Sequence, residues 1–157
     1  MHCKEYAQNG NLVNLKNKIL QKSSLSKTLL LYIAGGILDA LHYIHANKKI
    51  IHMNINKENV LLDDFLNVKL INFSASINYK NKSLKDTILL PLAGTYYYMP
   101  PEVLGQKHIK VSEVSKIDIY SLGVLLYYLA FNDYPYQLED VNHEDHAQIV
   151  KNILEHD

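Results

Sequence analysis

The sequence lacks the features that mark several classes of protein. Cys3 is its only cysteine, so no disulfide can form within the chain, and a reducing compartment is the default. No basic-then-apolar leader opens the chain, and the uncharged run Ile119–Asn132 is shorter than a membrane span. Sixteen Lys and Arg residues balance sixteen Asp and Glu residues, which leaves no basic excess for binding nucleic acid or an anionic membrane. We therefore expect a cytoplasmic protein with no nucleic-acid partner and no membrane partner.

The residues that are present predict a mainly helical domain. The chain has 157 residues, 48% of them hydrophobic, which is enough for one domain with a buried core. Apolar residues at helical spacing predict helices from Leu12 to Leu20, from Ser24 or Ser26 to about His45, and from Ile117 to Phe131. We expect the third helix, which is almost free of charge, to be buried on all sides. The pair Gly35-Gly36 inside the second helix indicates a close approach by another element.

Short apolar runs replace the helical pattern in the middle of the chain. Val60–Leu62 and Val68–Ile71 predict two strands joined by a turn at residues 63–67. A long polar segment follows, and Asn142 with Asp145 predicts the start of a last helix. The expected order is two helices, two short strands, a long loop, a buried helix and a final helix.

Five motifs together carry a resemblance to a known family. They are EYAQNGNL, IIHMNINKENVLL, VKLINFSAS, GTYYYMPPEVL and KIDIYSLGVLLYYL. In this order and spacing, the chain resembles the C-terminal lobe of a eukaryotic protein kinase of the serine/threonine branch, from the hinge onward. The resemblance implies a mainly α fold, within a family that is α+β as a whole, with short strands around the catalytic loop. It also implies that residues 1–157 form a partial kinase-like domain without the N-terminal lobe and the last helices.

The catalytic loop of the family reads H-R-D-L-x-x-x-N, and this chain departs from it at the positions that carry charge. His52 and Asn59 match, whereas Met53 replaces the Arg and Asn54 replaces the Asp that accepts the substrate proton. Asn56 stands where serine/threonine kinases place a lysine that steadies the transferred phosphate. An amide cannot take up a proton near neutral pH, so Asn54 and Asn56 are degenerate catalytic positions.

The nucleotide and metal positions implied by the resemblance show a similar loss. The D-F-G motif has become Asn72-Phe73-Ser74, so Asn72 replaces the carboxylate that binds magnesium together with Asn59. A neutral amide is a poorer ligand for this hard cation, which argues against ATP and magnesium as cofactors. If nucleotide binding is retained, the resemblance assigns it to Glu5, Ala7, Leu61, Asn59 and Asn72. Magnesium would then contact only Asn59 and Asn72.

The positions that shape the family's scaffold are kept. By the resemblance, His52 and Phe73 stack in a hydrophobic column, and Asp118 is the buried acid that anchors the catalytic-loop backbone. Glu102 matches an acid that pairs with an arginine near the end of the domain, but no arginine follows it here. The sequence therefore keeps residues that shape the fold of the family and lacks the charged residues of its catalytic positions.

Three hypotheses follow for function. The first, which we favour, is a pseudokinase lobe that acts by binding a protein partner. The second is a weakly active, ATP-dependent serine/threonine kinase whose N-terminal lobe lies outside this chain. The third is a fragment without function, whose exposed apolar surfaces would make it poorly soluble.

Several other clusters have simpler interpretations. His42 with His45 and the run His143–His146 have metal-ligand residue types, but we interpret both as ordinary helix residues without a metal. The run Tyr96-Tyr97-Tyr98 could be a phosphorylation target, although packing against the lobe is favoured. Lys80, Lys82 and Lys85 are interpreted as a solvated loop.

Overall fold

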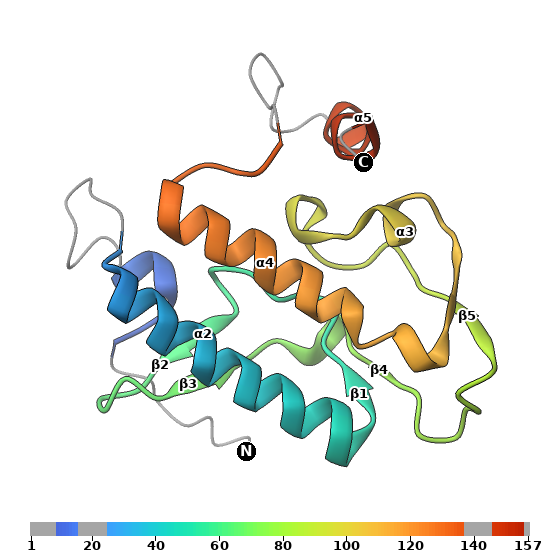
Figure 1. The fold of residues 1–157 in the computed structure, drawn as a ribbon, viewed down its shortest axis with the longest axis horizontal. Helices are drawn as coiled ribbons and strands as arrows, with labels where there is room; N and C mark the ends of the chain where they lie inside the picture. Colours follow the sequence, from blue (N-terminus) through green and yellow to red (C-terminus); the bar gives the residue numbers. More distant parts are fainter. Residues whose placement is uncertain (1–8, 16–24, 137–145, 156–157) are drawn as a thin grey trace.

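The structure is a computed structural model, and it describes residues 9–15, 25–136 and 146–155. Its helices are α2 (Lys27–His42), α3 (Pro101–Leu104), α4 (Lys116–Phe131) and α5 (His146–Glu155). Its strands are β1 (Ile50–Ile51), β2 (Val60–Leu62), β3 (Val68–Leu70), β4 (Ile77–Asn78), β5 (Thr87–Leu89) and β6 (His108–Lys110). The described part of the chain is thus mainly helical, with short antiparallel strands around the loop at residues 52–59, as expected for this fold class (Figure 1).

Helix α2 begins and ends close to the predicted residues. The side-chain oxygen of Ser26 accepts a hydrogen bond from the backbone N–H of Leu29 at 3.3 Å, so Ser26 is the N-cap. The helix continues past His42 as a π-helical turn over Tyr43–Lys48 and ends where Lys49 adopts a left-handed conformation. Residues 12–15 are also helical, whereas the rest of the first predicted helix lies outside the described residues.

The hairpin of β2 and β3 confirms the two predicted strands. Val60 pairs with Leu70 and Leu62 with Val68 in an antiparallel register. The side chain of Asp63 closes the turn by accepting hydrogen bonds from the backbone N–H groups of Phe65 and Asn67. The hairpin lies directly on α2, because a Cβ atom added at Gly36 would meet the side chain of Val68 at 2.6 Å. The predicted close approach of another element to the glycine pair is therefore confirmed at Gly36.

Helix α4 is less buried than the sequence suggests. It has the predicted extent to within one residue, and its buried residues are Ile117, Asp118, Ser121, Leu122, Val124, Leu125 and Leu129. However, Ile119, Tyr127 and Phe131 are exposed, so the prediction of burial on all sides is wrong. The physical reason is that no described element covers this face of the helix.

The long polar segment before α4, predicted as a loop, contains additional structure. Strand β4 pairs with β1, and β5 pairs with β6, in two antiparallel pairs that join residues far apart in the chain. Helix α3 lies between β5 and β6 in the chain, and α5 packs against it (Figure 1). The predicted cap of the last helix, Asn142 with Asp145, lies outside the described residues.

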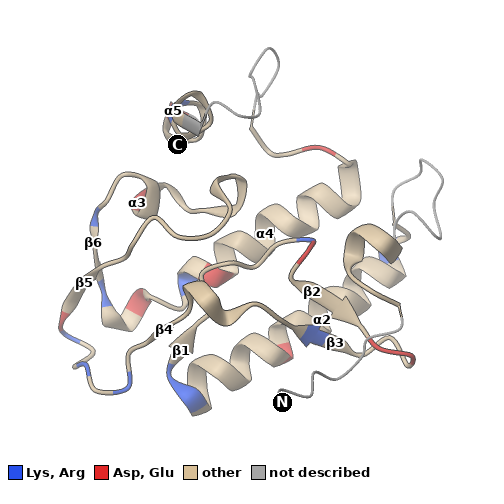
Figure 2. Cartoon of the chain, turned by 180° about the vertical axis from the view of Figure 1, so that it is seen from behind, with Lys and Arg blue, Asp and Glu red and all other residues tan. Residues whose placement is uncertain are grey.

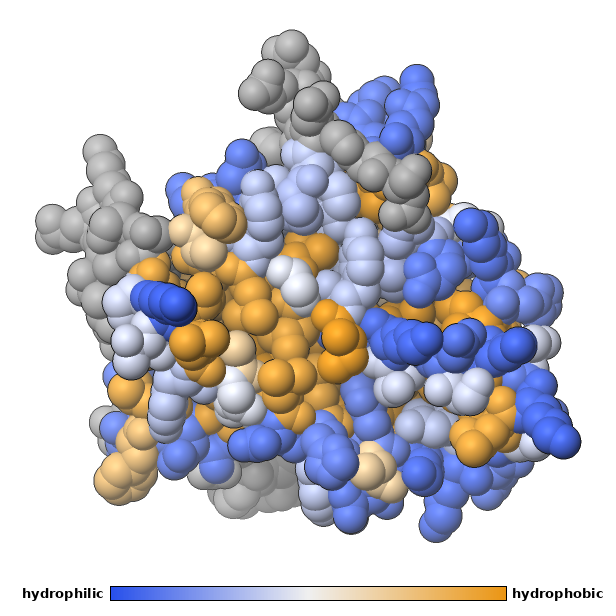
Figure 3. Space-filling view, in the orientation of Figure 1, coloured by the Kyte–Doolittle hydropathy of each residue, from blue (hydrophilic) through white to orange (hydrophobic). Residues whose placement is uncertain are grey.

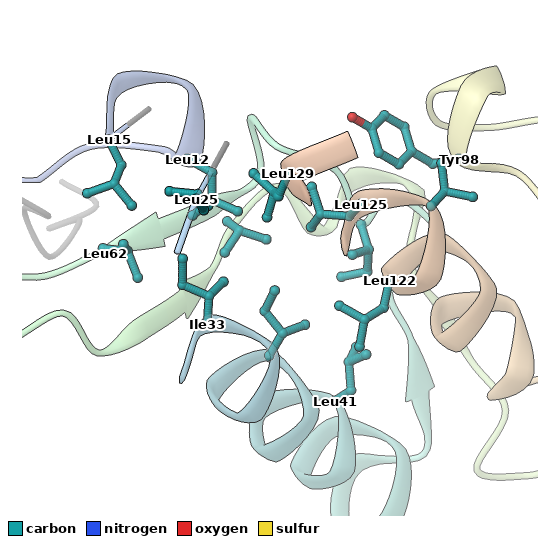
Figure 4. Close-up of a cluster of buried hydrophobic side chains, with 14 of the residues drawn as sticks. Leu12, Leu15, Leu25, Ile33, Leu41, Leu62, Tyr98, Leu122, Leu125 and Leu129 are labelled. Atoms are coloured by element: carbon teal, nitrogen blue, oxygen red, sulfur yellow. The ribbon is translucent and has the colours of Figure 1, made fainter. Parts of the chain in front are cut away.

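Two clusters of buried apolar side chains make up the core. The first lies between α2, α4 and β2 and includes Leu12, Ile33, Leu41, Leu125 and Leu129 (Figure 4). The second lies beneath the β5–β6 pair, α3 and α5, and includes Met53, Ile88, Ile109, Ile149 and Ile153.

Helices α2 and α4 lie side by side and antiparallel, and they leave an apolar patch on the surface between them (Figures 1 and 3). Their exposed apolar residues include Leu31, Leu38, Ile119 and Tyr127. By length and hydropathy alone, the helical stretches Lys27–Lys48 and Val111–Phe131 could cross a membrane. Core helices satisfy the same criterion, and one face of each helix here lies in the apolar core.

Candidate functional site

The buried carboxylate of Asp118 holds the loop between β1 and β2 in place. Asp118 lies in the first turn of α4 and is fully buried. Its oxygens accept hydrogen bonds from the backbone N–H groups of His52 and Met53 at 2.8 and 2.9 Å, and Nε2 of His45 lies 2.7 Å away. Met53 has a φ of 65°, a left-handed conformation that costs about 1–3 kcal/mol for such a residue. The bonds to Asp118 stabilise this strained backbone and fix the path of the loop.

The imidazole of His52 is buried and neutral. Its Nδ1 accepts a hydrogen bond from the backbone N–H of Asn54, so the proton lies on Nε2, which donates to the carbonyl of Ile71 at 3.0 Å. Burial lowers the pKa of His52 below its usual value of 6.5, although the negative charge of Asp118 raises it. The ring centroid lies 4.5 Å from that of Phe73. His52 therefore joins the loop to the segment that carries Asn72.

The side chain of Asn54 accepts two hydrogen bonds. Its Oδ1 accepts from Nδ2 of Asn56 at 2.9 Å and from the hydroxyl of Thr95 at 3.2 Å. Nδ2 of Asn56 also donates to the Thr95 hydroxyl, at 3.1 Å, while its Oδ1 accepts from the backbone N–H groups of Glu58 and Asn59. The three side chains form a closed triangle of neutral groups. None of them can accept a proton near neutral pH.

A second set of amides continues from this triangle. Nδ2 of Asn59 donates to the backbone carbonyl of Asn54 at 2.9 Å, and Nδ2 of Asn72 donates to Oδ1 of Asn59 at 3.3 Å. Oδ1 of Asn72 accepts from the hydroxyl of Ser74 at 2.7 Å. The fold thus brings all four asparagines of the two motifs, Asn54, Asn56, Asn59 and Asn72, into one hydrogen-bonded network.

Comparison with known proteins gives this geometry its context. The family model for the protein kinase domain matches residues 1–156. The chain belongs to the protein kinase family. In kinases, the segment around His52 and Asn54 is the catalytic loop, and Asn72-Phe73-Ser74 lies at the D-F-G position.

The relatives are named as serine/threonine kinases or as members of a kinase family. The chain is 40% identical over 106 residues to a probable serine/threonine-protein kinase KIN1 homolog from Encephalitozoon cuniculi, covering 67% of this chain and 17% of the relative. It is 32% identical over 136 residues to serine/threonine-protein kinase shk2 from Schizosaccharomyces pombe, covering 87% and 21%. It is also 32% identical over 149 residues to NUAK family SNF1-like kinase 1 from Homo sapiens, covering 95% and 20%. The chain therefore spans about a fifth of the length of the curated relatives it matches.

The residues at the kinase magnesium positions do not fit the ion. Magnesium requires a near-octahedral set of oxygens and favours carboxylates. Here Asn59 and Asn72 supply two neutral amide oxygens, and each already accepts a hydrogen bond within the protein. Within the described residues, no group of three His, Cys, Asp or Glu side chains lies close enough to hold a metal.

Lys57 lies next to the degenerate lysine position but does not replace it. Its ammonium donates to the hydroxyl of Tyr128 at 3.1 Å and lies 4.2 Å from the centre of that ring. Partial burial lowers the pKa of Lys57, but the hydrogen bond with Tyr128 contributes to a net increase, so the ammonium stays charged. The positive charge of Lys57 therefore lies against Tyr128 of α4. This contact could not be predicted from the sequence, because no local pattern indicates where a long side chain ends.

The remaining predicted site residues lie around the network. Leu61 is half-buried in β2, on the opposite face from its two buried neighbours. Phe73 is 42% exposed beyond its contact with His52. Glu102 lies in α3, and its carboxylate makes no ion pair with any residue that the structure describes. Glu5 and Ala7, the predicted hinge residues, lie outside the described residues.

Proposed function

We propose that this chain is a catalytically impaired protein kinase domain that acts by binding a protein partner. The hydrogen bonding of Asn54 is the observation that carries the first part of the proposal. The amide stands where kinases place the catalytic Asp, and its oxygen accepts from both Asn56 and Thr95. Because it cannot take the proton of a substrate hydroxyl, the loss of a general base costs about 10²–10⁴ in rate.

The nucleotide positions support the same proposal. Asn72 turns its amide N–H toward Asn59 and its oxygen toward Ser74, so neither oxygen of the pair offers a charge to magnesium. The hinge residues of the sequence prediction lie outside the described residues and add no support. In this proposal, ATP and magnesium are not required cofactors.

Retention of the scaffold supports a role in binding. Asp118 still holds the backbone of His52 and Met53, and His52 still contacts Phe73. The chain thus keeps the strained backbone of a catalytic loop while the proton-transfer groups are gone. A folded surface is sufficient to recognise a protein, because recognition needs shape and complementary groups but no general base. We infer a cytoplasmic location from the kinase relatives.

A weakly active serine/threonine kinase is the second candidate. It is favoured by the hydrogen bond between Thr95 and Asn54, which keeps the segment after Gly94 against the catalytic loop. It is also favoured by the relatives that are named as serine/threonine kinases. This candidate requires the glycine-rich loop and strand lysine of an N-terminal kinase lobe.

Two measurements on the full-length gene product test the proposal. Phosphate transfer from radiolabelled ATP is measured with magnesium and with manganese, for the natural protein and for Asn54→Ala. We expect no transfer above background in either protein. Robust transfer that Asn54→Ala abolishes would favour the weakly active kinase. In a thermal-shift assay with millimolar ATP, with and without the metals, we expect no increase in melting temperature, because stabilisation follows ligand occupancy.

A further inference from the structure

The pairing of β5 with β6 joins the activation segment, here residues 72–102, to the segment after α3. Thr87 pairs with Lys110 and Leu89 with His108. Two flanking backbone hydrogen bonds extend this contact, from Val111 to Asp86 at 2.9 Å and from Ser112 to Leu84 at 3.3 Å. The side chain of Gln106 also donates to the carbonyl of Leu90 at 3.2 Å. The two segments therefore form one ribbon.

The ribbon is fixed to the core on one side only. Ile88 and Ile109, which pair at its centre, are buried in the second cluster together with Met53. The residues on either side of each isoleucine point outward, so Thr87, Leu89, His108 and Lys110 are all exposed. A face supported in this way is ordered before it meets a ligand, which lowers the entropic cost of binding.

The ribbon and the loops that flank it are rich in exposed lysines. Lys80, Lys82, Lys85, Lys107 and Lys110 are exposed, and none forms an ion pair with a described residue. Residues 78–92 and 105–112 contain these five lysines and one acid, Asp86, which gives a formal charge of +4. Figure 2 shows basic residues along β6 and the loop before β5, with single acids at β5, in α3 and after β6, and a further pair of acids in the β2–β3 turn on the opposite side. The chain is neutral as a whole, so acids elsewhere in the chain balance this positive charge.

Exposed leucines lie among these lysines. Leu84, Leu89 and Leu92 are 65%, 51% and 47% exposed. We call the lysines listed above, together with these leucines and His108, the basic ribbon face. Lysines that lack a partner steer an oppositely charged ligand, and leucines among them contribute apolar area when they are covered.

We propose that the basic ribbon face binds an acidic segment of a partner protein, with apolar side chains between its carboxylates. This inference rests on the proposed function, because it names the chemistry of the partner of a binding module. A protein fits better than a nucleic acid. The basic area is confined to one ribbon, it contains exposed leucines, and the chain as a whole has no basic excess.

The test uses the 157-residue chain and a fluorescein-labelled peptide of alternating Glu and Leu residues. The control peptide has Gln in place of each Glu. Binding is measured by fluorescence anisotropy at low and at high salt. We expect the Glu peptide to bind at least about tenfold more tightly than the Gln peptide at low salt, and high salt to remove most of this difference.

Matched variants locate the binding surface. Lys82→Glu, Lys85→Glu and Lys110→Glu together should weaken binding of the Glu peptide by at least about tenfold. Lys27→Glu, Lys69→Glu and Lys151→Glu change the total charge equally at other places and should weaken it much less. Leu89→Ser should weaken binding while leaving the salt dependence unchanged. Melting curves of each variant verify that it is folded.

Several results would overturn the inference. They are equal binding of the two peptides, equal losses in the two triple variants, no binding of the Glu peptide at millimolar concentration, or tighter binding of phosphatidylserine vesicles or of an RNA duplex. The phosphate-transfer assay is run on the full-length gene product, in which binding of the Glu peptide is measured as well. Transfer with intact peptide binding would contradict the proposed function alone, whereas neither transfer nor peptide binding would contradict the inference alone.

Discussion

At the scale of single residues, His52 makes the stability of the folded chain depend on pH. Burial lowers its pKa below 6.5 in the folded protein, whereas the unfolded chain titrates near 6.5. Below pH 6.5 the unfolded chain therefore binds a proton at His52 that the folded chain does not bind. The stability that neutral His52 contributes is complete above pH 6.5 and is lost as the pH falls toward the lowered pKa.

We expect the free energy of urea unfolding to fall between about pH 7.5 and about pH 5.5 more steeply in the natural chain than in His52→Gln. His42→Gln, which removes an exposed histidine, is the matched control. Identical slopes in all three proteins would show that His52 is not held neutral by the fold.

Met53 illustrates how a charged position of the family has become a packing position. It stands where the catalytic loop of kinases has Arg, but here its side chain is 4% exposed and lies among Leu90, Met99 and Ile117. Met53→Arg would bury an unpaired guanidinium, so we expect it to destabilise the chain by about 3–5 kcal/mol. Met53→Leu keeps the volume and should cost less than about 1.5 kcal/mol. Urea unfolding measures both, and equal losses would contradict the burial of this position.

At the scale of elements, the two adjacent glycines of α2 have opposite surroundings. A Cβ atom at Gly36 would meet Val68 at 2.6 Å, whereas one at Gly35 would have no heavy atom within 4 Å. We expect Gly36→Ala to destabilise the chain by about 1–3 kcal/mol through overpacking. Gly35→Ala should stabilise it by about 0.5–1 kcal/mol, because alanine loses less backbone entropy. Thermal melts measure both changes.

The glycine prediction has an internal control. Val68→Ala removes the methyl groups that the new Cβ atom would meet, so it should recover part of the loss in Gly36→Ala. The packing of α2 on the hairpin would be wrong if the two glycine variants shifted the melting temperature in the same direction.

How far the fold could be predicted depends on whether its signals are local. The start of α2 and the β2–β3 turn were predictable, because Ser26 caps one and Asp63 closes the other within a few residues. The β1–β4 and β5–β6 pairs were not predictable. Their strands are two or three residues long, and they pair positions far apart, such as Ile50 with Asn78. The exposed face of α4 was also missed, because apolar composition does not show which neighbours are present.

The candidate site could also be predicted only in part. The ordered motifs placed Asn54, Asn59 and Asn72 near one another through the family resemblance, and the structure brings them into one network. Where Lys57 points could not be predicted, since its ammonium ends at Tyr128, which lies 71 residues away in the chain. The direction of a long side chain is set by tertiary contacts, which a sequence motif does not contain.

At the scale of the whole molecule, α4 connects the two parts of the core. Ile117 belongs to the second cluster, whereas Leu122, Leu125 and Leu129 belong to the first. Between these positions, Asp118 binds the backbone of the catalytic loop. Neither cluster can lose α4 without exposing apolar surface of the other, so we expect the two to unfold together.

This coupling gives a test that also separates a functional module from a fragment without function. The chain has 12 tyrosines and no tryptophan, so near-ultraviolet circular dichroism reports tyrosine packing and the far-ultraviolet signal reports the helices. We expect both signals to change in a single transition at one temperature in a monomeric sample. Leu125→Ala, at a fully buried position of the first cluster, should cost about 2–5 kcal/mol and shift both signals equally. Ile109→Ala, at a buried position of the second cluster, is the matched variant and should also shift both signals together. Two separate transitions, or aggregation that prevents a monomeric sample, would favour the fragment, because its apolar face between α2 and α4 would then dominate its behaviour.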